Sequence, residues 1–216
     1  KQLSELPEGV ELEVCIESTL APGSLTYGEC CLRGATEEEI LVSCHACHPS
    51  LGNDNLSGLA VTTALAKAMR GKGRRYSYRF IFIPATIGAI TWMARNETAL
   101  KNIRHGLVIT GVGDRGPTTY KKSRRGDAEV DRAMQHVLRH EEPAHRVSEF
   151  FPYGYDERQY CSPALKLSVG CLMRTPHGQY PEYHTSANNL EFVRPESLAE
   201  SYSHCLALFD ILERNR

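Results

Sequence analysis

Residues 44–58 read CHACHPSLGNDNLSG and lie between two segments of regular structure. The apolar run 40–42 before them indicates a buried strand, and residues 59–69 after them have helical character. Open α/β sheets place their ligands in such segments, between the carboxyl end of a strand and a helix. Two histidines, two cysteines and an aspartate here suit zinc or a similar divalent ion. The alternative is a polar turn in which Asp54 or Asn55 only caps the next helix.

Length and composition favour one soluble α/β domain over residues 1–216, with enough apolar sequence (41%) for a sizeable core. Twenty-five basic and 26 acidic side chains give a formal net charge of -1, so no nucleic-acid partner and no anionic membrane surface are expected. No apolar run reaches the roughly 20 residues that span a bilayer, and no signal peptide opens the chain. The start at Lys1 suggests a fragment of a longer polypeptide.

The eight cysteines indicate buried, reduced thiols in a cytoplasmic protein rather than a disulfide framework. Two of them are adjacent, and several lie in strand-like apolar runs. Cys44 and Cys47 form a C-x-x-C pair, but the second half of a four-cysteine zinc site is missing. We expect no thiolate ligand from Cys47, since a soft ligand would compete with activation of water at the site.

Strands and helices alternate along most of the chain, after two strands that suggest a hairpin. The hairpin is expected from strands at 11–18 and 25–32 around a turn at 21–24. The further strands are expected at 40–44, 76–84, 106–110 and 165–172, and the helices at 56–69, 86–95, 127–140 and 195–214. This order predicts an α/β fold: a three-layer αβα arrangement with a central mixed β-sheet.

Three later segments also place polar groups where apolar sequence stops. Asp114 follows the strand expected at 106–110. Residues 155–160 contain two acids, an arginine and two phenols, and residues 181–186 contain a glutamate and a histidine two positions apart. Taken alone, the first of these two segments reads as a solvated loop with an internal ion pair, and His184 as a loop histidine bonded to backbone.

Together these motifs resemble the zinc aminopeptidase superfamily, which shares a three-layer, zinc-exopeptidase-like fold with glutaminyl cyclases and carboxypeptidases. The matching motifs are H-x-x-x-x-x-D-N-x-S-G, the P-x-T-I-G helix start and a late Tyr-His-Thr. The runs CHPS, NDNLSG, DERQYCSP and YPEYHTS resemble more closely a bacterial aminopeptidase-like family associated with polysaccharide biosynthesis.

The resemblance implies metal ligands. Asp54 matches the aspartate that bridges two zinc ions in active aminopeptidases, and His184 matches the late histidine ligand. For the early histidine, His45 matches by its place at the strand end and His48 by the Cys-His-Pro-Ser motif; we favour His48. Asp114 lies near a further aspartate ligand of the superfamily, in a looser alignment.

Two positions depart from the superfamily pattern. Active aminopeptidases carry a Glu-Glu pair, as general base and metal ligand, where this chain has Ala85 and Thr86. Neither side chain can take a proton from water near neutral pH. We therefore expect one zinc ion rather than two, with Glu157 or Glu182 as the catalytic base.

The resulting hypothesis is a zinc-dependent, aminopeptidase-like hydrolase that cuts an amide bond of a small peptide-like or amino-sugar substrate. Asp156, Arg158 and Tyr160 are the expected substrate-binding residues, with Arg158 suited to a carboxylate and Tyr160 to an oxyanion. One alternative is a catalytically impaired metal-binding module that recognises a sugar or peptide precursor. Another is an acyl-transfer or cyclising enzyme on the same fold.

Overall fold

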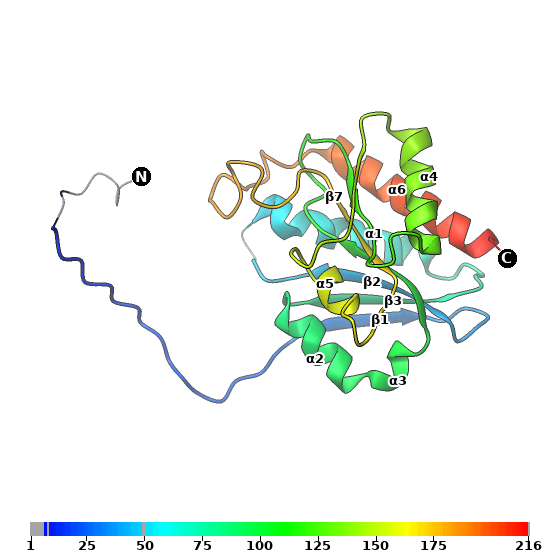
Figure 1. The fold of residues 1–216 in the computed structure, drawn as a ribbon, viewed down its shortest axis with the longest axis horizontal. Helices are drawn as coiled ribbons and strands as arrows, with labels where there is room; N and C mark the ends of the chain where they lie inside the picture. Colours follow the sequence, from blue (N-terminus) through cyan, green and yellow to red (C-terminus); the bar gives the residue numbers. More distant parts are fainter. Residues whose placement is uncertain (1–6, 8, 49–50, 216) are drawn as a thin grey trace.

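The computed structural model describes residues 7, 9–48 and 51–215, and these residues form a mixed sheet flanked by helices (Figure 1). The sheet has seven strands in the order β1-β3-β2-β4-β7-β5-β6. The strands are β1 (Gly28–Leu32), β2 (Glu39–His45), β3 (Ser77–Ile83), β4 (Ile103–Ile109), β5 (Thr119–Lys121), β6 (Arg146–Ser148) and β7 (Val169–Met173). The helices are α1 (Gly58–Met69), α2 (Ile87–Arg95), α3 (Glu97–Leu100), α4 (Glu129–Glu141), α5 (Glu157–Tyr160) and α6 (Pro195–Arg214).

Four strands in the middle of the sheet run in the same direction: β3, β2, β4 and β7. The strand β1 is antiparallel to β3, and β5 is antiparallel to β7 and parallel to β6. The carboxyl ends of the four parallel strands therefore meet at one edge of the sheet. Open α/β sheets bind their ligands at this edge.

Two apolar layers cover the two faces of the sheet. In Figure 1, α1, α4 and α6 lie on one side of the sheet and α2, α3 and α5 on the other. Strand side chains alternate between the layers: Tyr78 and Phe80 pack with the first group of helices, whereas Ile81 and Ile83 pack with the second. The prediction of a three-layer αβα fold with a mixed sheet is confirmed.

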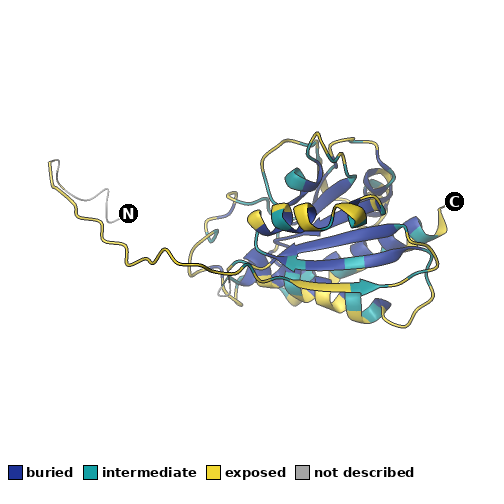
Figure 2. Cartoon of the chain, turned by 90° about the horizontal axis from the view of Figure 1, so that it is seen from below, coloured by how far each residue is buried: buried dark blue, intermediate teal, exposed yellow. Residues whose placement is uncertain are grey.

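The predicted hairpin at the start of the chain is wrong. Residues 11–18 form no strand, and their apolar side chains are exposed, with Val14 at 79% and Ile16 at 77%. Figure 2 shows the segment before β1 running away from the sheet as an exposed trace. Residues 11–18 alternate polar and apolar side chains, but a strand also needs a partner, and β1 pairs with β3, about 50 residues later in the chain.

The remaining elements follow the predictions closely, apart from short ones. Helix α6 has the predicted bounds, and β2, β3, α2 and α4 differ from theirs by one or two residues. Strand β4 begins three residues earlier than predicted, and β7 begins four residues later. The elements β5, β6, α3 and α5 were not predicted; each has three or four residues, too few to show a periodic pattern.

The eight cysteines are all unpaired thiols, as predicted. Four of them, Cys44, Cys161, Cys171 and Cys205, are buried. None of the helices in the described part of the chain is both long and apolar enough to cross a membrane.

Candidate metal centre

Three side chains that can bind a metal converge at the carboxyl edge of the parallel strands. One ligand atom each from His48, Asp54 and His184 lies within 4.8 Å of the others. His48 and Asp54 belong to the segment between β2 and α1, and His184 to the long connection between β7 and α6. This is the ligand set that we favoured from the sequence, and segments 130 residues apart bring it together.

Asp54 is the buried centre of this cluster, with 1% of its surface exposed. Its Oδ1 lies 2.8 Å from His45 Nε2, and its Oδ2 lies 3.0 Å from His184 Nε2. The side chain of His184 is 48% exposed, so the centre opens to solvent on the histidine side. A buried carboxylate with an open side towards solvent suits a site that exchanges water or substrate.

His45 supports Asp54 rather than joining the cluster. The Asn55 Nδ2 amide lies 3.4 Å from His45 Nδ1, so a neutral ring there accepts at Nδ1 and donates from Nε2 to Asp54. The ring of Tyr155 stacks on the His45 imidazole at 4.8 Å. Packing and hydrogen bonds thus fix the ring that orients the carboxylate, as supporting residues of metal sites do.

The charge state of Asp54 suits a cation ligand. Burial alone would raise the pKa of its carboxyl group. The hydrogen bond from His45 and the nearby imidazoles of His45, His184 and His48 outweigh burial and hold this pKa below its ordinary value. Asp54 is therefore a carboxylate at neutral pH.

The asparagines on either side of Asp54 fix the loop that carries it. Asn55 Oδ1 accepts hydrogen bonds from the backbone N–H groups of Gly58 and Gly111, at 3.1 and 3.0 Å. Its Nδ2 donates to the carbonyl oxygens of His45 and Ile109, both at 3.3 Å. One amide side chain therefore joins the ends of β2 and β4 to the start of α1.

Asn53 and Ser57 continue this scaffold on the same side of the loop. Asn53 Oδ1 accepts from Gly113 N–H at 2.7 Å, and the backbone N–H of Asn53 donates to Asn188 Oδ1 at 2.7 Å. Ser57 Oγ donates to the carbonyl of Asn53 and accepts from Val112 N–H. Because residues 53, 55 and 57 face inward to backbone partners, Asp54 faces the cluster. The side chains of the NDNLSG motif thus hold the loop so that the Asp54 carboxylate faces the cluster.

The donor set fits zinc. Two imidazoles and one carboxylate are the ligands of many catalytic zinc sites, which leave a fourth position for water or substrate. Their ligand atoms are spaced within 4.8 Å, and ligands of one zinc ion lie about 3–4 Å apart. Zinc in such a set supplies Lewis acidity. Cys47 stays outside the group: its Sγ accepts a hydrogen bond from the Ala85 N–H at 2.9 Å.

Asp114 does not belong to the His48–Asp54–His184 cluster. Its Oδ1 accepts from Gly116 N–H at 2.7 Å and from the Thr175 hydroxyl at 2.6 Å. Its Oδ2 accepts from the Asn53 amide at 3.0 Å and from Thr175 N–H at 3.2 Å. Four protein donors thus occupy a carboxylate that the sequence suggested as a ligand, and Asp114 serves to tie the loop after β4 to the loop after β7.

Glu157 and Tyr160 also make contacts away from the cluster. Glu157 is completely buried, and its Oε1 lies 2.8 Å from Lys121 Nζ. Tyr160 is equally buried, and its hydroxyl lies 3.0 Å from Ser43 Oγ on β2. These positions favour a role in holding α5 against the sheet over the catalytic and substrate-binding roles that the sequence suggested.

Asp156 is the most unusual carboxyl group near the sheet edge. It is fully buried, and neither of its oxygens has a hydrogen-bond partner among the described residues. Burial, and then repulsion from Glu157, raises its pKa to about 7, against the opposing effect of Arg158. Arg158 is half-buried beside it, and its Nε also lacks a partner in the part of the chain that the structure describes.

Two positions bear on the identity of the catalytic base: Glu182, a candidate base, and Ala85. Glu182 is half-buried in the same loop as His184, two residues earlier, and its carboxylate forms no ion pair with any described residue. Ala85 lies two residues after the end of β3, and its N–H donates to Cys47 Sγ in the segment that carries His48. The position where the motif resemblance implies a glutamate in active aminopeptidases thus lies beside the segment that carries His48.

Sequence reasoning missed the aromatic groups that support the histidines. Tyr183 stacks on His184 at 3.9 Å, and His177 contacts Tyr155 edge-on at 5.1 Å. Tyr155 and Tyr183 lie inside motifs that the sequence had singled out, so their proximity to the site was available as a signal. His177 belongs to no such motif, and no pattern in the sequence indicates it.

The fold and the cluster together define an aminopeptidase-like α/β domain. Comparison with known proteins agrees: the chain belongs to the DUF4910 family, described as a domain of unknown function, whose model matches residues 2–215. It is 51% identical over 206 residues to a protein of Clostridium acetobutylicum described as a polysaccharide biosynthesis protein with aminopeptidase-like domain. That match covers 95% of this chain and 47% of the relative.

Solved structures show the same fold. A crystal structure described as a peptidase from Clostridium acetobutylicum has a TM-score of 0.86 and 51% identity, and covers 88% of this chain and 45% of that one. A zinc aminopeptidase from Bacillus subtilis has a TM-score of 0.72 at 16% identity, over 88% and 50% of the two chains. A glutaminyl cyclase from an Acidobacteriales bacterium has a TM-score of 0.73 at 13% identity, over 88% and 74%. The chain spans about half the length of the first two of these structures and of the curated relative.

Proposed function

We propose that this domain is a zinc-dependent hydrolase of aminopeptidase type that cuts an amide bond of a small peptide-like substrate. The observation that carries the proposal is the convergence of His48, Asp54 and His184 at the carboxyl edge of the parallel strands. The aminopeptidase-like fold and the zinc aminopeptidases among its structural neighbours support it.

In this proposal, each residue of the centre has a separate task. His48, Asp54 and His184 would hold one zinc ion, whose Lewis acidity polarises the scissile carbonyl. His45 and Asn55 orient Asp54 through their hydrogen bonds. Glu182 is the better placed of the two candidate bases, since Glu157 is buried against Lys121. Glu182 would take the proton from the attacking water and pass it to the leaving amine.

A second candidate function is a metal-binding module with impaired catalysis. Ala85 favours it, because a methyl group cannot take up a proton where active aminopeptidases have a glutamate. The cyclising alternative finds support in the glutaminyl cyclase among the structural neighbours, a likeness of fold alone.

Turnover of aminoacyl 4-nitroanilides by the zinc-loaded protein tests the proposal. We expect slow hydrolysis that requires zinc, is lost in His184→Ala and falls by about 10²-fold or more in Glu182→Gln. The matched control is Glu191→Gln, an exposed glutamate between the same loop and α6. Full zinc occupancy with no turnover would favour the metal-binding module. Turnover with an unchanged rate in Glu182→Gln would show that the base is another group.

A further inference from the structure

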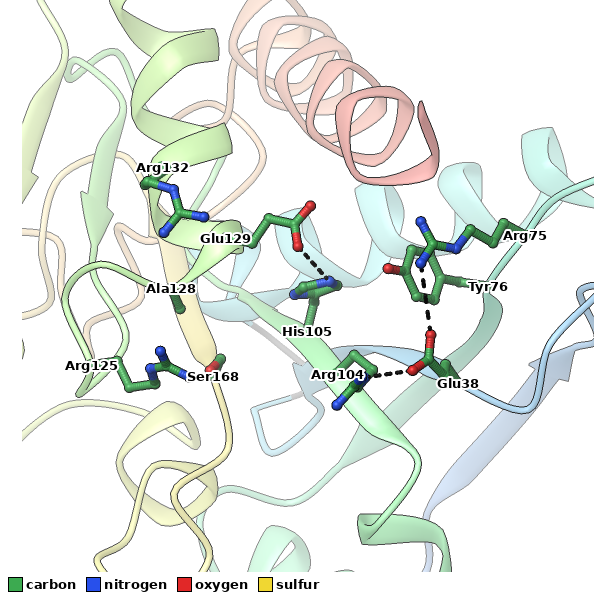
Figure 3. A pocket seen from close by; sticks show the side chains of 10 residues that line it. All are labelled: Glu38, Arg75, Tyr76, Arg104, His105, Arg125, Ala128, Glu129, Arg132 and Ser168. Carbon is green, nitrogen blue, oxygen red and sulfur yellow. Dashed lines mark ion pairs between the residues drawn. The ribbon is translucent and has the colours of Figure 1, made fainter. Parts of the chain in front are cut away.

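A polar cavity of about 350 Å³ lies at the edge of the sheet opposite the metal centre. Its lining includes residues at or just before the starts of the parallel strands: Glu38 before β2, Tyr76 before β3, Arg104 and His105 in β4 and Ser168 before β7. Arg75, next to Tyr76, also lines the cavity. The other lining residues belong to the start of α4 and the turn before it: Arg125, Ala128, Glu129 and Arg132 (Figure 3).

The cavity carries an excess of positive charge. Four of its lining residues are arginines and two are glutamates. Glu38 is shared between Arg104, at 2.7 Å, and Arg75, at 4.0 Å. Glu129 lies 3.5 Å from His105 Nε2. Both carboxylates therefore already have a partner. In Figure 3, Glu38 lies across the cavity from Arg125 and Arg132, whereas Glu129 projects from the same helix as Arg132.

Arg125 and Arg132 have almost no carboxylate partner of their own. Among the described residues, their one carboxylate within 4.0 Å is that of Asp127, 3.9 Å from Arg125 Nε. Arg132 donates instead to the backbone carbonyl of Asp127. Both guanidinium groups lie at the amino end of α4, a helix of 13 residues whose dipole adds further positive potential there. An arginine has five N–H donors, so each guanidinium group keeps donors beyond these contacts, and two such forks at this position suit the oxygens of a phosphate group.

His105 supplies a second, independent sign of a ligand. The residue is 93% buried (7% exposed), and its Nδ1 has no hydrogen-bond partner among the described residues. Burial, together with the nearby charges of Arg104 and Arg75, lowers the pKa of His105 against the opposing effect of Glu129 and Glu38, so the ring is neutral near pH 7. With Nε2 donating towards Glu129, Nδ1 is an acceptor that needs a donor such as a hydroxyl group.

The groups around His105 suit a polyhydroxyl molecule rather than a bare anion. Carboxylates repel a phosphate but accept hydrogen bonds from hydroxyl groups, and Glu38 and Glu129 both face this cavity. The Ser168 hydroxyl adds a group that can donate or accept, and the Tyr76 ring meets the His105 ring edge-on at 5.5 Å. We propose that this cavity binds a phosphorylated sugar, with its phosphate between Arg125 and Arg132 and its hydroxyl groups towards Glu38, Glu129 and His105.

Isothermal titration of the full chain at low ionic strength tests this proposal, with glucose 6-phosphate, inorganic phosphate and glucose as probes. We expect saturable binding of glucose 6-phosphate, at least about tenfold weaker binding of phosphate, and none of glucose. The double substitution Arg125→Ala/Arg132→Ala should reduce the affinity for glucose 6-phosphate at least about tenfold. Arg139→Ala, an exposed arginine on the same helix outside the cavity, should leave it unchanged.

Three results would overturn the proposal. One is no saturable binding of glucose 6-phosphate up to about 10 mM. Another is equal affinity for inorganic phosphate, which would leave an anion site without sugar recognition. The third is binding that survives Arg125→Ala/Arg132→Ala but disappears in His184→Ala, which would place the phosphate at the metal centre instead.

Discussion

Ala85 occupies the most informative single position of the chain. It lies in the short turn between β3 and α2, two residues before the helix, whose amino end favours a negative charge. Its N–H contacts Cys47, so a longer side chain at this position would start next to the segment that bears His48. Active aminopeptidases use a carboxylate here, and this chain offers a methyl group.

We therefore expect Ala85→Glu to raise the rate of aminoacyl anilide hydrolysis by zinc-loaded protein. General-base catalysis is typically worth about 10²–10⁴-fold, and the substitution should recover part of that factor. Ala85→Gln is the matched control, with the same size and no base. An equal gain in both variants, or no gain in Ala85→Glu with zinc still bound, would contradict a missing base at this position.

The buried carboxyl group of Asp156 should make the stability of the fold depend on pH. Its pKa of about 7 in the folded chain lies above the ordinary 3.8, so the folded state binds more protons between these pH values. Stability should therefore fall as the pH rises from about 4 to 7, at up to about 1.4 kcal/mol per pH unit. Asp156→Asn removes this titration and should be more stable than the wild type at pH 8.

Urea unfolding at pH 5, 6, 7 and 8 measures this difference. The stability of wild type relative to Asp156→Asn should decrease from pH 5 to pH 7 and level off by pH 8. A constant difference between the two proteins would show that the carboxyl group does not titrate in this range.

The turn from residue 52 into α1 is the element on which the metal centre depends. Gly58 is its tightest point: a Cβ there would lie 2.4 Å from Asn55 Oδ1 and 2.7 Å from the Ile109 carbonyl oxygen. Because Asn55 holds the loop in place, Gly58→Ala should displace Asp54. We expect a loss of about 1–3 kcal/mol in stability together with weaker zinc binding.

Gly73→Ala is the control for this substitution, since a Cβ at Gly73 meets no atom within 4 Å. Thermal unfolding and competitive zinc titration of both variants provide the comparison. Unchanged zinc affinity in Gly58→Ala would show that the loop does not position the carboxylate.

The contact between β5 and α5 is expected to contribute to the stability of the fold. Lys121 and Glu157 form a buried pair at 2.8 Å, and Lys121 Nζ also donates to the Tyr153 carbonyl at 2.7 Å. Lys121→Met should leave an unpaired buried carboxylate and cost about 3–5 kcal/mol in urea unfolding. The double substitution Lys121→Met/Glu157→Gln should recover most of this loss. A double variant that stays as unstable as Lys121→Met would show that the pair is not what holds the element.

The sequence predicted those helices and strands whose own residues show a periodic apolar pattern or a helix-start residue. The strand β3 alternates large apolar side chains, and α6 has a proline at its first turn and an apolar face along its length. The pairing of β1 with β3 depends on contacts about 50 residues apart, which no local pattern encodes. The same limit applies to Asp114, whose four donors come from three separate segments.

In the whole molecule, the two candidate sites lie at opposite edges of one sheet. The carboxyl ends of the parallel strands carry the His48–Asp54–His184 cluster, and their amino ends carry the arginine-lined cavity. The convergence of His48, Asp54 and His184 was predictable because a family resemblance links distant motifs to one centre. The cavity was not predictable, since its arginines are scattered among three segments without a common motif.

The zinc content of the purified chain tests the metal centre most directly. After equilibrium dialysis against buffered zinc, we expect one zinc ion per chain in the wild type. Elemental analysis should find little or no zinc in His48→Ala, Asp54→Ala and His184→Ala, and full occupancy in Asp114→Asn, whose carboxylate already accepts four protein hydrogen bonds. A wild type without zinc, or equal occupancy in the wild type and the three cluster variants, would contradict the metal centre.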